Sequence, residues 1–311
     1  MELSQLRYLV AVADTGSFTV AAQKLGLSQP SLSLGVKRLE DEIGHPLFDR
    51  LTRRVVPTEA GGLMIETARR IFADLDRAST EIRELRGEVN GVLRVGTIPT
   101  MGPFMLPGIV ESFGKQYPEV HIQVVETVTD RILQMLEVGD IDVAMTSVLQ
   151  DRAGIHSETI AHEELMAVVP SNHPLAERNS FVEWKDLEEE RFLFLGGEHC
   201  LAEQMARFCR KNRVNGKTML EGAQLATIAA LVERGLGVSL VPALMARGSY
   251  SGCWFGHLAG PRPSRPICLA WSVLRYRSKA GRAFIEMARG IVREMLSAAE
   301  DADVAAEPPA K

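Results

Sequence analysis

The chain has 311 residues, of which 46% are apolar and 24% charged, and its formal net charge is −5. This length allows about two domains with full cores, and the net charge by itself does not indicate a nucleic-acid-binding protein. The first ten residues lack a basic stretch leading into an apolar run, and charged residues and a proline interrupt the longest apolar region, 225–246. These features disfavour a secretory signal and a membrane span, so we expect a cytoplasmic protein without membrane contacts.

Residues 18–44 predict two short helices joined by a tight turn. The first has an apolar stripe of Ala21, Ala22 and Leu25. Gly26 should end it, and Ser28 should cap a second helix that has a proline in its first turn and stops at Gly44. The second helix is expected to bury residues spaced by four and three positions, namely Leu32, Val36, Leu39 and Ile43. Helices joined this closely cross steeply, as in a helix-turn-helix.

The N-terminal end of the second helix is predicted to enter the major groove of DNA. The side chains expected at that face are Gln29, Pro30, Ser31, Ser33, Leu34 and Lys37. Amides and hydroxyls bond base edges, and a leucine can pack on a thymine methyl. Segment 47–61 predicts a two-stranded wing with phosphate-binding arginines, Arg50, Arg53 and Arg54. An ordinary solvated surface is the alternative, but the order of cap, core stripe, polar face and basic wing favours DNA binding.

A long helix is expected to follow, with an apolar seam spaced by four and three residues. The seam consists of Met64, Ala68, Ile71, Leu75, Ala78, Ile82 and Leu85, and its flanks are charged. Such a narrow stripe is typical of a helix that pairs with another helix, although a single buried helix is the alternative. We interpret it as a dimerisation helix that places two reading heads on two DNA half-sites.

The stretch GSFTVAAQKLGLSQPSLSLGVKRLEDEIGHPLFDRLTRRVVPTEAG, residues 16–61, resembles the N-terminal region of LysR-type transcriptional regulators. The resemblance implies promoter DNA, a second copy of the chain and RNA polymerase as partners, and no enzymatic activity. It implies an all-α winged helix-turn-helix domain at 1–59 and a linker helix at 60–88. In most of the family an arginine and a polar residue stand where this chain has Leu34 and Gly35, so one usual DNA contact is absent.

Beyond residue 91, strand-like runs alternate with helical stretches such as 103–117 and 130–140. The runs are 92–99, 122–127, 141–147, 165–170, 192–196, 238–242 and 267–273. This alternation predicts an α/β fold with mostly parallel sheets and a ligand site at the carboxyl ends of the strands. Hydroxyl side chains near those ends, Thr97, Thr100, Thr127, Thr129, Thr146 and Ser147, suggest a small polar ligand, although they could be ordinary turn residues.

The LysR resemblance implies a periplasmic-binding-protein-like effector domain at 91–296, made of two Rossmann-like subdomains with an effector cleft between them. Strands near 160–165 and 264–269 are expected to cross between subdomain I, about 91–162 and 268–296, and subdomain II, about 163–267. Residues 297–311 have the composition of a disordered tail.

The four cysteines have no zinc-binding spacing, so no metal or cofactor is expected. We interpret Cys253 and Cys268 as small buried hydrophobes. Cys200 and Cys209 lie nine residues apart in a predicted helix, where they would be separated by about 13.5 Å along the axis. A disulfide requires Cα atoms roughly 4.4–6.8 Å apart, so this pair can bond only if the helix unwinds, and the bond would act as a switch.

The position of Cys200 suggests a reactive thiol. It stands near the helix start, where free N–H groups favour a thiolate, and His199 precedes it. Peroxide converts such a thiolate to a sulfenic acid, which a second thiol can trap as a disulfide. Cys209, between an aromatic and a basic residue, is the expected second thiol.

Three segments resemble OxyR-type hydrogen peroxide sensors, a LysR-type subgroup: GEHCLAEQMARFC at 197–209, GTIPTMGPFMLP at 96–107 and ETVTDRIL at 126–133. The resemblance implies that Cys200 is the peroxidatic and Cys209 the resolving thiol. It also implies that Thr100, Thr129 and His199 position and activate the peroxide. An arginine usual in the last core strand is missing, since Ser272 stands in its place.

Three other functions remain as alternatives. A LysR-type regulator could respond to a small organic anion in the cleft lined by Thr100 and Thr129. A thiol peroxidase would need a recycling partner, and the helix-turn-helix disfavours it. A solute-binding protein would account only for the α/β part of the chain.

Overall fold

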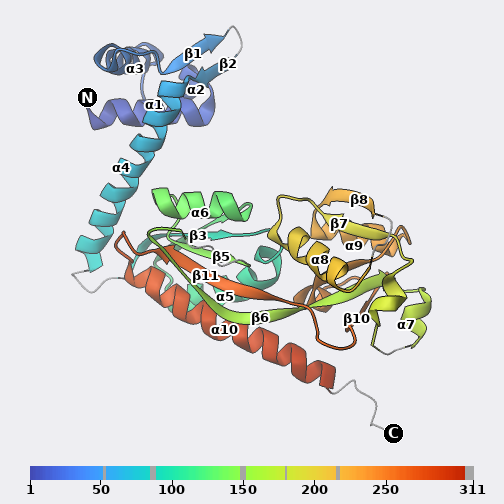
Figure 1. Ribbon diagram of the computed structural model, residues 1–311. Coiled ribbons are helices and arrows are strands. Elements are labelled where there is room, and N and C mark those ends of the chain that lie inside the picture. Colours follow the sequence, from blue (N-terminus) through green and yellow to red (C-terminus); the bar gives the residue numbers. More distant parts are fainter. Residues whose placement is uncertain (52–53, 85–88, 148–151, 179–180, 215–217, 305–311) are drawn as a thin grey trace. The chain divides into compact units, whose positions relative to one another are not determined.

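The computed structural model describes residues 1–51, 54–84, 89–147, 152–178, 181–214 and 218–304 (Figure 1). The chain divides into two compact units, one built mainly from Met1–Ile82 and one from Arg83–Glu137 with Ile141–Lys311. Each unit has its own hydrophobic core.

The first unit is a helical head with a two-stranded wing. Its elements are α1 (Leu3–Thr15), α2 (Phe18–Lys24), α3 (Gln29–Ile43), β1 (Phe48–Leu51), β2 (Arg54–Pro57) and α4 (Glu59–Glu84). The predicted boundaries of α3 are confirmed: the Ser28 hydroxyl accepts the N–H of Ser31, and Gly44 ends the helix with φ 78°. Gly26, with φ 67°, follows the end of α2, as expected.

Apolar residues of α1, α2 and α3 form the core of this head. Leu32, Val36 and Leu39 of α3 are fully buried, as the spacing predicted, whereas Ile43 at the end of the helix is only partly buried. The start of α4 joins this core through Ile65 and Ala68. The outer part of the α4 seam is different, because Leu75 is 45% exposed and Ile82 is 59% exposed in the single chain. The seam residue Leu85 lies outside the described residues.

The second unit contains a mixed seven-stranded sheet. Strand order is β10-β6-β11-β5-β3-β4, and β9 pairs with β6. The strands are β3 (Gly91–Thr97), β4 (Val120–Glu126), β5 (Val143–Thr146), β6 (Ile155–Pro170), β9 (Ser239–Pro242), β10 (Cys253–Gly256) and β11 (Ser264–Ser272). Only β3 with β4 and β3 with β5 pair in parallel among the described strands of this sheet, so the expectation of mostly parallel sheets is wrong. The long strands β6 and β11 impose the antiparallel pairs.

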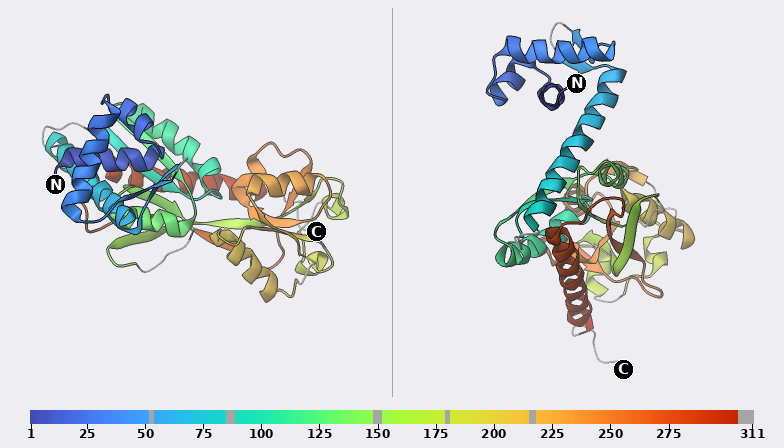
Figure 2. Two further views of the ribbon diagram at one scale, coloured as in Figure 1. Left: turned by 90° about the horizontal axis from the view of Figure 1, so that it is seen from above. Right: turned by 90° about the vertical axis from the view of Figure 1, so that its left-hand side faces the viewer.

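The crossing strands connect two subdomains. β6 pairs with β11 over much of its length, and its C-terminal half also pairs with β9 and β10. One core cluster lies around β3, β5, α5 (Gly102–Gln116) and α10 (Lys279–Val304), and another lies around β7 (Phe192–Leu195), α8 (Cys200–Lys211) and α9 (Leu225–Glu233). Figure 2 shows the yellow-green and orange crossing strands between these two halves of the unit.

The remaining elements complete this unit. They are α6 (Thr129–Val138), α7 (Pro174–Arg178), η1 (Trp184–Leu187), β8 (Thr218–Ala223), which pairs in parallel with β7, and η2 (Ala243–Arg247). Helix α10 packs against α5 and β6 (Figure 1). It continues through Val304, so the prediction of disorder is wrong for residues 297–304, while 305–311 lie outside the description. Among the described helices, none combines the length and apolar character needed to cross a bilayer.

Candidate functional site

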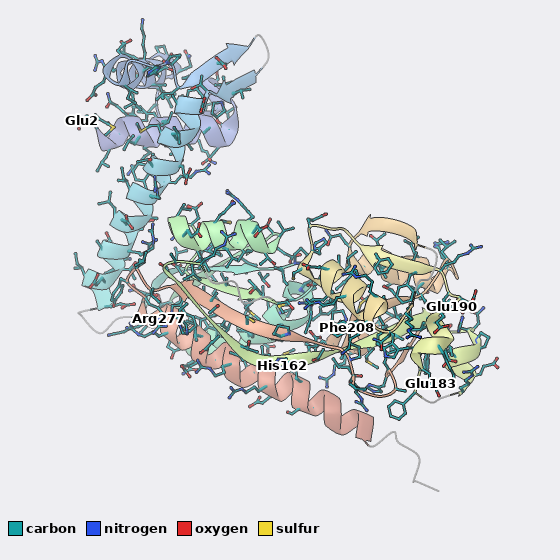
Figure 3. All side chains as sticks on the ribbon, in the orientation of Figure 1. Glu2, His162, Glu183, Glu190, Phe208 and Arg277 are labelled. Carbon is teal, nitrogen blue, oxygen red and sulfur yellow. The ribbon has the colours of Figure 1, made fainter. Side chains whose placement is uncertain are left out.

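Helix α8 begins at Cys200 and carries the predicted redox pair. His199 is its N-cap residue, with extended backbone angles and a side chain that is only 5% exposed. Cys200 is partly exposed and packs against the core of subdomain I. Figure 3 shows α8, labelled at Phe208, above the crossing strand that is labelled at His162.

A small enclosed cavity lies at the Cys200 end of α8. The gaps between its lining atoms, open solvent included, total about 150 Å³ and leave no room for a water-sized sphere. The lining residues are Ile98, Thr100, Val128, Thr129, His199 and Cys200. The structure therefore brings together four side chains that the sequence placed in three separate segments. All three segments follow β3, β4 or β7 at the carboxyl end of the strand, where α/β folds place their ligand sites.

Three buried side-chain atoms have no hydrogen-bond partner among the described residues: Thr97 Oγ1, Thr129 Oγ1 and Gln204 Oε1. Of these three residues only Thr129 lines the cavity. All three are more than nine-tenths buried. Because an unpaired buried polar group costs about 1–3 kcal/mol, such atoms are typical of a site that a small polar molecule can complete.

Cys209 lies apart from this cavity. Its side chain is 3% exposed and packs in the core of subdomain II together with Leu201 and Met205. Burial raises the pKa of the Cys209 thiol to about 12, so this thiol is protonated at neutral pH. The two cysteines of α8 thus contact different cores, and the intact helix keeps them apart.

Arg265 on β11 is a site residue that the sequence reading missed. Its Nη1 donates to Thr100 Oγ1 at 2.9 Å and its Nη2 donates to the Thr100 carbonyl oxygen at 2.7 Å. Its Nε and Nη2 also bond Glu163 Oε2, at 2.9 and 2.7 Å, and both side chains are fully buried. β11 thus carries a buried arginine near the cavity, seven residues before Ser272, and the loss of a usual arginine at position 272 stays a prediction.

A signal for Arg265 was present in the sequence. The run SRPICLAWS is otherwise apolar or small around this one charged residue, and a charge within a buried strand needs a partner. The partner could not be recognised from the sequence because Glu163 lies on the other crossing strand, 102 residues earlier. Glu163 Oε1 also accepts the N–H of Leu244, which ties both crossing strands to η2.

The predicted DNA-reading face is exposed on α3. Gln29, Pro30, Ser31 and Lys37 are exposed, Leu34 is half exposed, and Ser33 is only partly exposed, less so than Leu34. Gly35 has a packing role, because a Cβ there would lie 2.6 Å from the ring of Tyr8. A glycine at position 35, in place of the polar residue expected there, thus allows α1 and α3 to pack closely.

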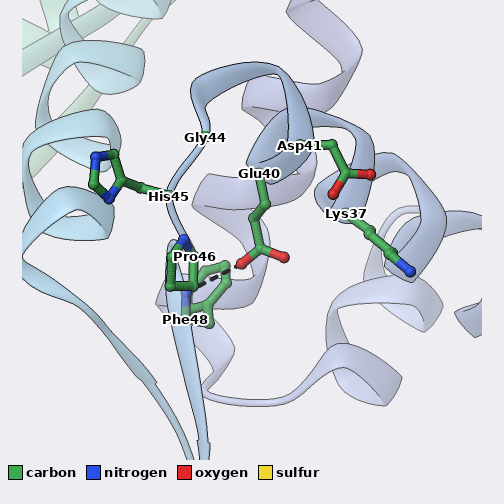
Figure 4. A pocket seen from close by; sticks show the side chains of 7 residues that line it. All are labelled: Lys37, Glu40, Asp41, Gly44, His45, Pro46 and Phe48. Atoms are coloured by element: carbon green, nitrogen blue, oxygen red, sulfur yellow. Dashed lines mark hydrogen bonds between the residues drawn. The ribbon is translucent and has the colours of Figure 1, made fainter.

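The wing is joined to α3 by a carboxylate. Glu40 Oε1 accepts the N–H of Leu47 at 2.8 Å and that of Phe48 at 3.3 Å. Figure 4 shows Glu40 directed at the start of β1, in a shallow groove that is also lined by Lys37, Asp41, Gly44, His45, Pro46 and Phe48. Of the wing arginines, Arg53 lies outside the described residues, and the side chains of Arg50 and Arg54 are not described.

Comparisons with known proteins agree for both units of the chain. The bacterial regulatory helix-turn-helix family of LysR type matches residues 3–62, and the LysR substrate binding domain family matches residues 86–292. A "Hydrogen peroxide-inducible genes activator" of Pectobacterium carotovorum subsp. carotovorum is 31% identical over 274 residues, which cover 87% of this chain and 90% of that protein.

Two solved structures share the architecture. A full-length OxyR of Pseudomonas aeruginosa, solved with one cysteine replaced by aspartate, has a TM-score of 0.71 and 28% identity, covering 94% of this chain and 95% of that one. A hydrogen peroxide-bound cysteine-to-serine mutant of Corynebacterium glutamicum OxyR has a TM-score of 0.63 and 30% identity, covering 97% of both chains. With its helix-turn-helix head and its two-subdomain effector unit, the chain belongs to the LysR family of bacterial transcriptional regulators.

Proposed function

We propose that this LysR-family regulator senses hydrogen peroxide through Cys200 and signals by forming a disulfide with Cys209. The observation that carries the proposal is the small cavity in which Cys200 meets Thr100, Thr129 and His199. A thiol at a helix N-terminus beside hydroxyl and imidazole groups can attack a peroxide that those groups hold in place. The names of the relatives, peroxide-inducible activators and OxyR, support the same proposal.

The proposed chemistry has two steps. The Cys200 thiolate attacks one peroxide oxygen, the O–O bond breaks, and the leaving hydroxide takes a proton to become water, which leaves a sulfenic acid. Thr129 Oγ1, which no described residue bonds, is placed to bond the peroxide. The Cys209 sulfur then attacks the sulfenic sulfur and a second water leaves. Two thiols and one peroxide thus give one disulfide and two waters.

The second step is the switch. Nine helical residues separate the thiols by about 13.5 Å along the axis, so α8 has to unwind before the sulfurs meet. Unwinding removes Leu201, Met205 and Cys209 from the core of subdomain II. This change of packing would shift the DNA half-site contacts of a paired regulator, as order–disorder transitions do in other switches.

The tightness of the cavity disfavours an organic anion. Pockets for small organic ligands usually span about 300–1,000 Å³, whereas this cavity leaves no room for even a water-sized sphere in the present structure. The buried cation beside it, Arg265, is already bonded to Glu163 and Thr100 and offers no free charge to a carboxylate. Both observations disfavour an organic anion, and even a ligand of two heavy atoms needs the cavity to open slightly.

The same proposal covers the partners and the place of action. Residues Gln29, Ser31, Ser33, Leu34 and Lys37 would read the major groove, and the wing arginines would bind phosphates. The exposed part of the α4 seam supports pairing with a second copy. A regulator that binds promoter DNA and RNA polymerase acts in the cytoplasm. Its cysteines would form a stoichiometric switch and not the active site of an enzyme.

One experiment tests the redox part. The reduced full-length protein is treated with a few equivalents of hydrogen peroxide, quenched with acid, and its disulfides are mapped by mass spectrometry. We expect a rapid Cys200–Cys209 link that is absent from Cys200→Ser and from Cys209→Ser. Cys253→Ser is the control and should behave as the native chain. If Cys200 oxidises no faster than Cys253, the proposed function is wrong.

A second experiment tests DNA contact by the wing. Replacing Arg50, Arg53 and Arg54 together by alanine should weaken binding to every promoter fragment that the native chain binds. It should also flatten the dependence of affinity on salt, because fewer phosphate contacts release fewer counterions. Unchanged affinity and salt slope would exclude these arginines from the interface.

A further inference from the structure

The last residue of α4, Glu84, is a buried carboxylate that the proposed peroxide switch does not use. Glu84 is 4% exposed, although Glu81, Ile82 and Arg83 before it are all exposed. Arg83 and Glu84 belong to the second compact unit, whereas α4 up to Ile82 belongs to the first. A glutamate is almost never buried unless its charge is paired, so the partners of Glu84 show what this position does.

Both carboxylate oxygens of Glu84 accept hydrogen bonds from the segment that begins α10. Oε1 accepts the N–H of Lys279 at 2.6 Å, and Oε2 accepts the hydroxyl of Tyr276 at 2.5 Å. Lys279 is the first residue of α10, and the first turn of α10 has no acidic residue of its own. Because a helix N-terminus has free N–H groups and a partial positive charge, Glu84 supplies the carboxylate that α10 lacks.

The contact is reciprocal, because Lys279 in turn caps the end of α4. Lys279 Nζ donates to the carbonyl oxygen of Glu84 at 2.9 Å. The last carbonyl oxygens of a helix have no partner within the helix, and a cation is favoured beside them. The ends of α4 and α10 thus complete each other, although 195 positions separate Glu84 from Lys279. We name Glu84, Tyr276 and Lys279 together the reciprocal cap.

The stability of α4 by itself does not explain a glutamate at position 84. A negative charge in the last turn of a helix opposes the dipole of that helix. Glu84 also lies on a different face of α4 from the apolar seam, because the two positions from Ile82 to Glu84 turn the helix by about 200°. A partner helix on the seam would therefore leave the reciprocal cap free to form.

The start of α10 is tied to the strand that also reaches the Cys200 cavity. Near the beginning of β11, Arg265 bonds Thr100 at the cavity wall. Beyond the other end of β11, the guanidinium of Arg277 lies 4.8 Å from the ring centre of Trp271. The carbonyl oxygen of Arg277 accepts Nη1 of Arg282, in the first turn of α10, at 2.6 Å. The connection from β11 to α10 is thus fastened to both elements, and a shift of β11 would move the start of α10.

We infer that Glu84 is a coupling residue: the reciprocal cap holds the last turn of α4 on the effector unit, so that a change in that unit alters α4 and, through it, DNA binding. As a route from Cys200 to DNA, the cap rests on the proposed function, whereas its coupling of α4 to the effector unit needs no peroxide. Coupling between two sites is reciprocal, so DNA binding must also change the start of α10.

The first arm of the test uses this reciprocity in the reduced full-length protein. Amide hydrogen exchange is measured by mass spectrometry with and without a promoter fragment that the protein binds. In the native chain we expect DNA to change the exchange rate in the first turns of α10 about fivefold, the lower end of usual coupling. Glu84→Ala should abolish this change, and Glu84→Gln, which keeps an oxygen for the N–H of Lys279, should retain part of it.

Glu81→Ala is the matched control for this arm, because Glu81 is an exposed glutamate of the same helix. It should behave as the native chain. If DNA has no effect on the start of α10 in the native chain, or has its full effect in Glu84→Ala, the coupling role of Glu84 is wrong.

The second arm separates this coupling from the proposed function. The native chain, Glu84→Ala and the milder Tyr276→Phe are treated with a few equivalents of hydrogen peroxide, their disulfides are mapped, and their footprints on the promoter fragment are compared with those of the reduced proteins. We expect the Cys200–Cys209 link in native yield in all three, and a smaller difference between the two footprints in both variants. A native difference in a folded variant would overturn the inference and leave the proposed function intact. Absence of the link from the native chain would refute the proposed function, and the exchange measurement would still decide the coupling.

Discussion

Thr129 carries a buried hydroxyl that no described residue bonds, at the wall of the Cys200 cavity. Replacing it by the isosteric Val removes a polar group without leaving a hole. We expect Thr129→Val to leave the free energy of unfolding unchanged or to raise it by up to about 1 kcal/mol, because an unsatisfied group is lost. The same change should slow oxidation of Cys200 by peroxide about tenfold to a hundredfold, the effect of losing one hydrogen bond to the transition state.

Thr97 provides the matched control for this prediction. Its hydroxyl is also buried and unbonded among the described residues, but Thr97 does not line the cavity. Thr97→Val should change stability in the same direction and leave the rate of Cys200 oxidation unaltered. Stopped-flow mixing with peroxide measures the rate, and denaturant unfolding measures stability. Equal slowing in both variants would assign the effect to packing rather than to a bond with peroxide.

Arg265 is the buried cation on which the position of Thr100 depends. Arg265→Leu leaves Glu163 buried and unpaired, and we expect it to lower the free energy of unfolding by about 3–5 kcal/mol. The double variant with Glu163→Gln should recover part of this loss, because the remaining charge is gone while an oxygen still accepts the N–H of Leu244. Urea unfolding of both variants checks this. A double variant no more stable than the single one would show that the ion pair is not the cause.

Burial of Cys209 predicts a pH dependence of stability in the reduced protein. Its pKa rises from the ordinary 9.0 to about 12 in the folded chain. Below pH 9 both states are protonated and stability is unaffected. Between pH 9 and 12 the unfolded chain loses this proton and the folded chain keeps it, so stability falls as pH rises, by at most about 1.4 kcal/mol per pH unit. The fall of stability with rising pH should be shallower by this amount in Cys209→Ala than in the native chain. Identical falls in the two proteins would contradict the raised pKa of the Cys209 thiol.

The C-terminal end of α8 shows how one element is prepared for unwinding. The N–H of Val214 bonds the Cys209 carbonyl oxygen at 3.0 Å, and the N–H of Arg213 bonds that of Arg210 at 3.3 Å. This is a Schellman cap, whose left-handed position is usually glycine. Here Arg213 holds it with φ 61°, the one non-glycine residue with positive φ among the described residues. The helix that carries the switch therefore has a strained end close to the resolving thiol.

Removing that strain should slow the switch without changing the sensing step. We expect Arg213→Gly to stabilise the end of α8 by up to about 1 kcal/mol and so to slow closure of the Cys200–Cys209 disulfide by up to about fivefold. Formation of the sulfenic acid should keep its native rate, which trapping with a sulfenic-acid probe measures. Arg213→Lys retains the Cβ and the charge and should behave as the native chain. If Arg213→Lys also slows closure of the disulfide, the backbone strain at position 213 has no part in the switch.

At the scale of the whole molecule, the exposed part of the α4 seam indicates that the chain pairs with a second copy. Leu75 and Ile82 are exposed in the single chain, although they continue the stripe that the head buries at Ala68. Placing Glu at both positions should convert the oligomer to monomer, because desolvated carboxylates would face each other across a helix pair. Glu substituted at two exposed, uncharged positions of α4 outside the seam, Leu63 and Ser79, is the control for added negative charge. Analytical ultracentrifugation should show a monomer only for the seam variant, and a monomer for both would point to charge instead.

The sequence by itself determined the local features of this protein. Helix starts and stops at Ser28, Gly26 and Gly44, and the buried stripe of α3, follow from capping and from a 3.6-residue period, which act within a few residues. The Cys200–Cys209 spacing likewise fixed that an intact helix separates the two thiols. The end of α10 was misread, because an acidic, alanine-rich segment at 297–304 is equally compatible with a continuing helix.

Only the tertiary structure decided which distant residues meet. Arg265 reaches Thr100 across 165 positions because β11 inserts beside β5 in a mixed sheet. The strand order and the antiparallel path of β6 and β11 create these contacts. Neither is encoded in the hydrophobic pattern of any single segment, because that pattern reports which face of a strand is buried and not which strand lies beside it.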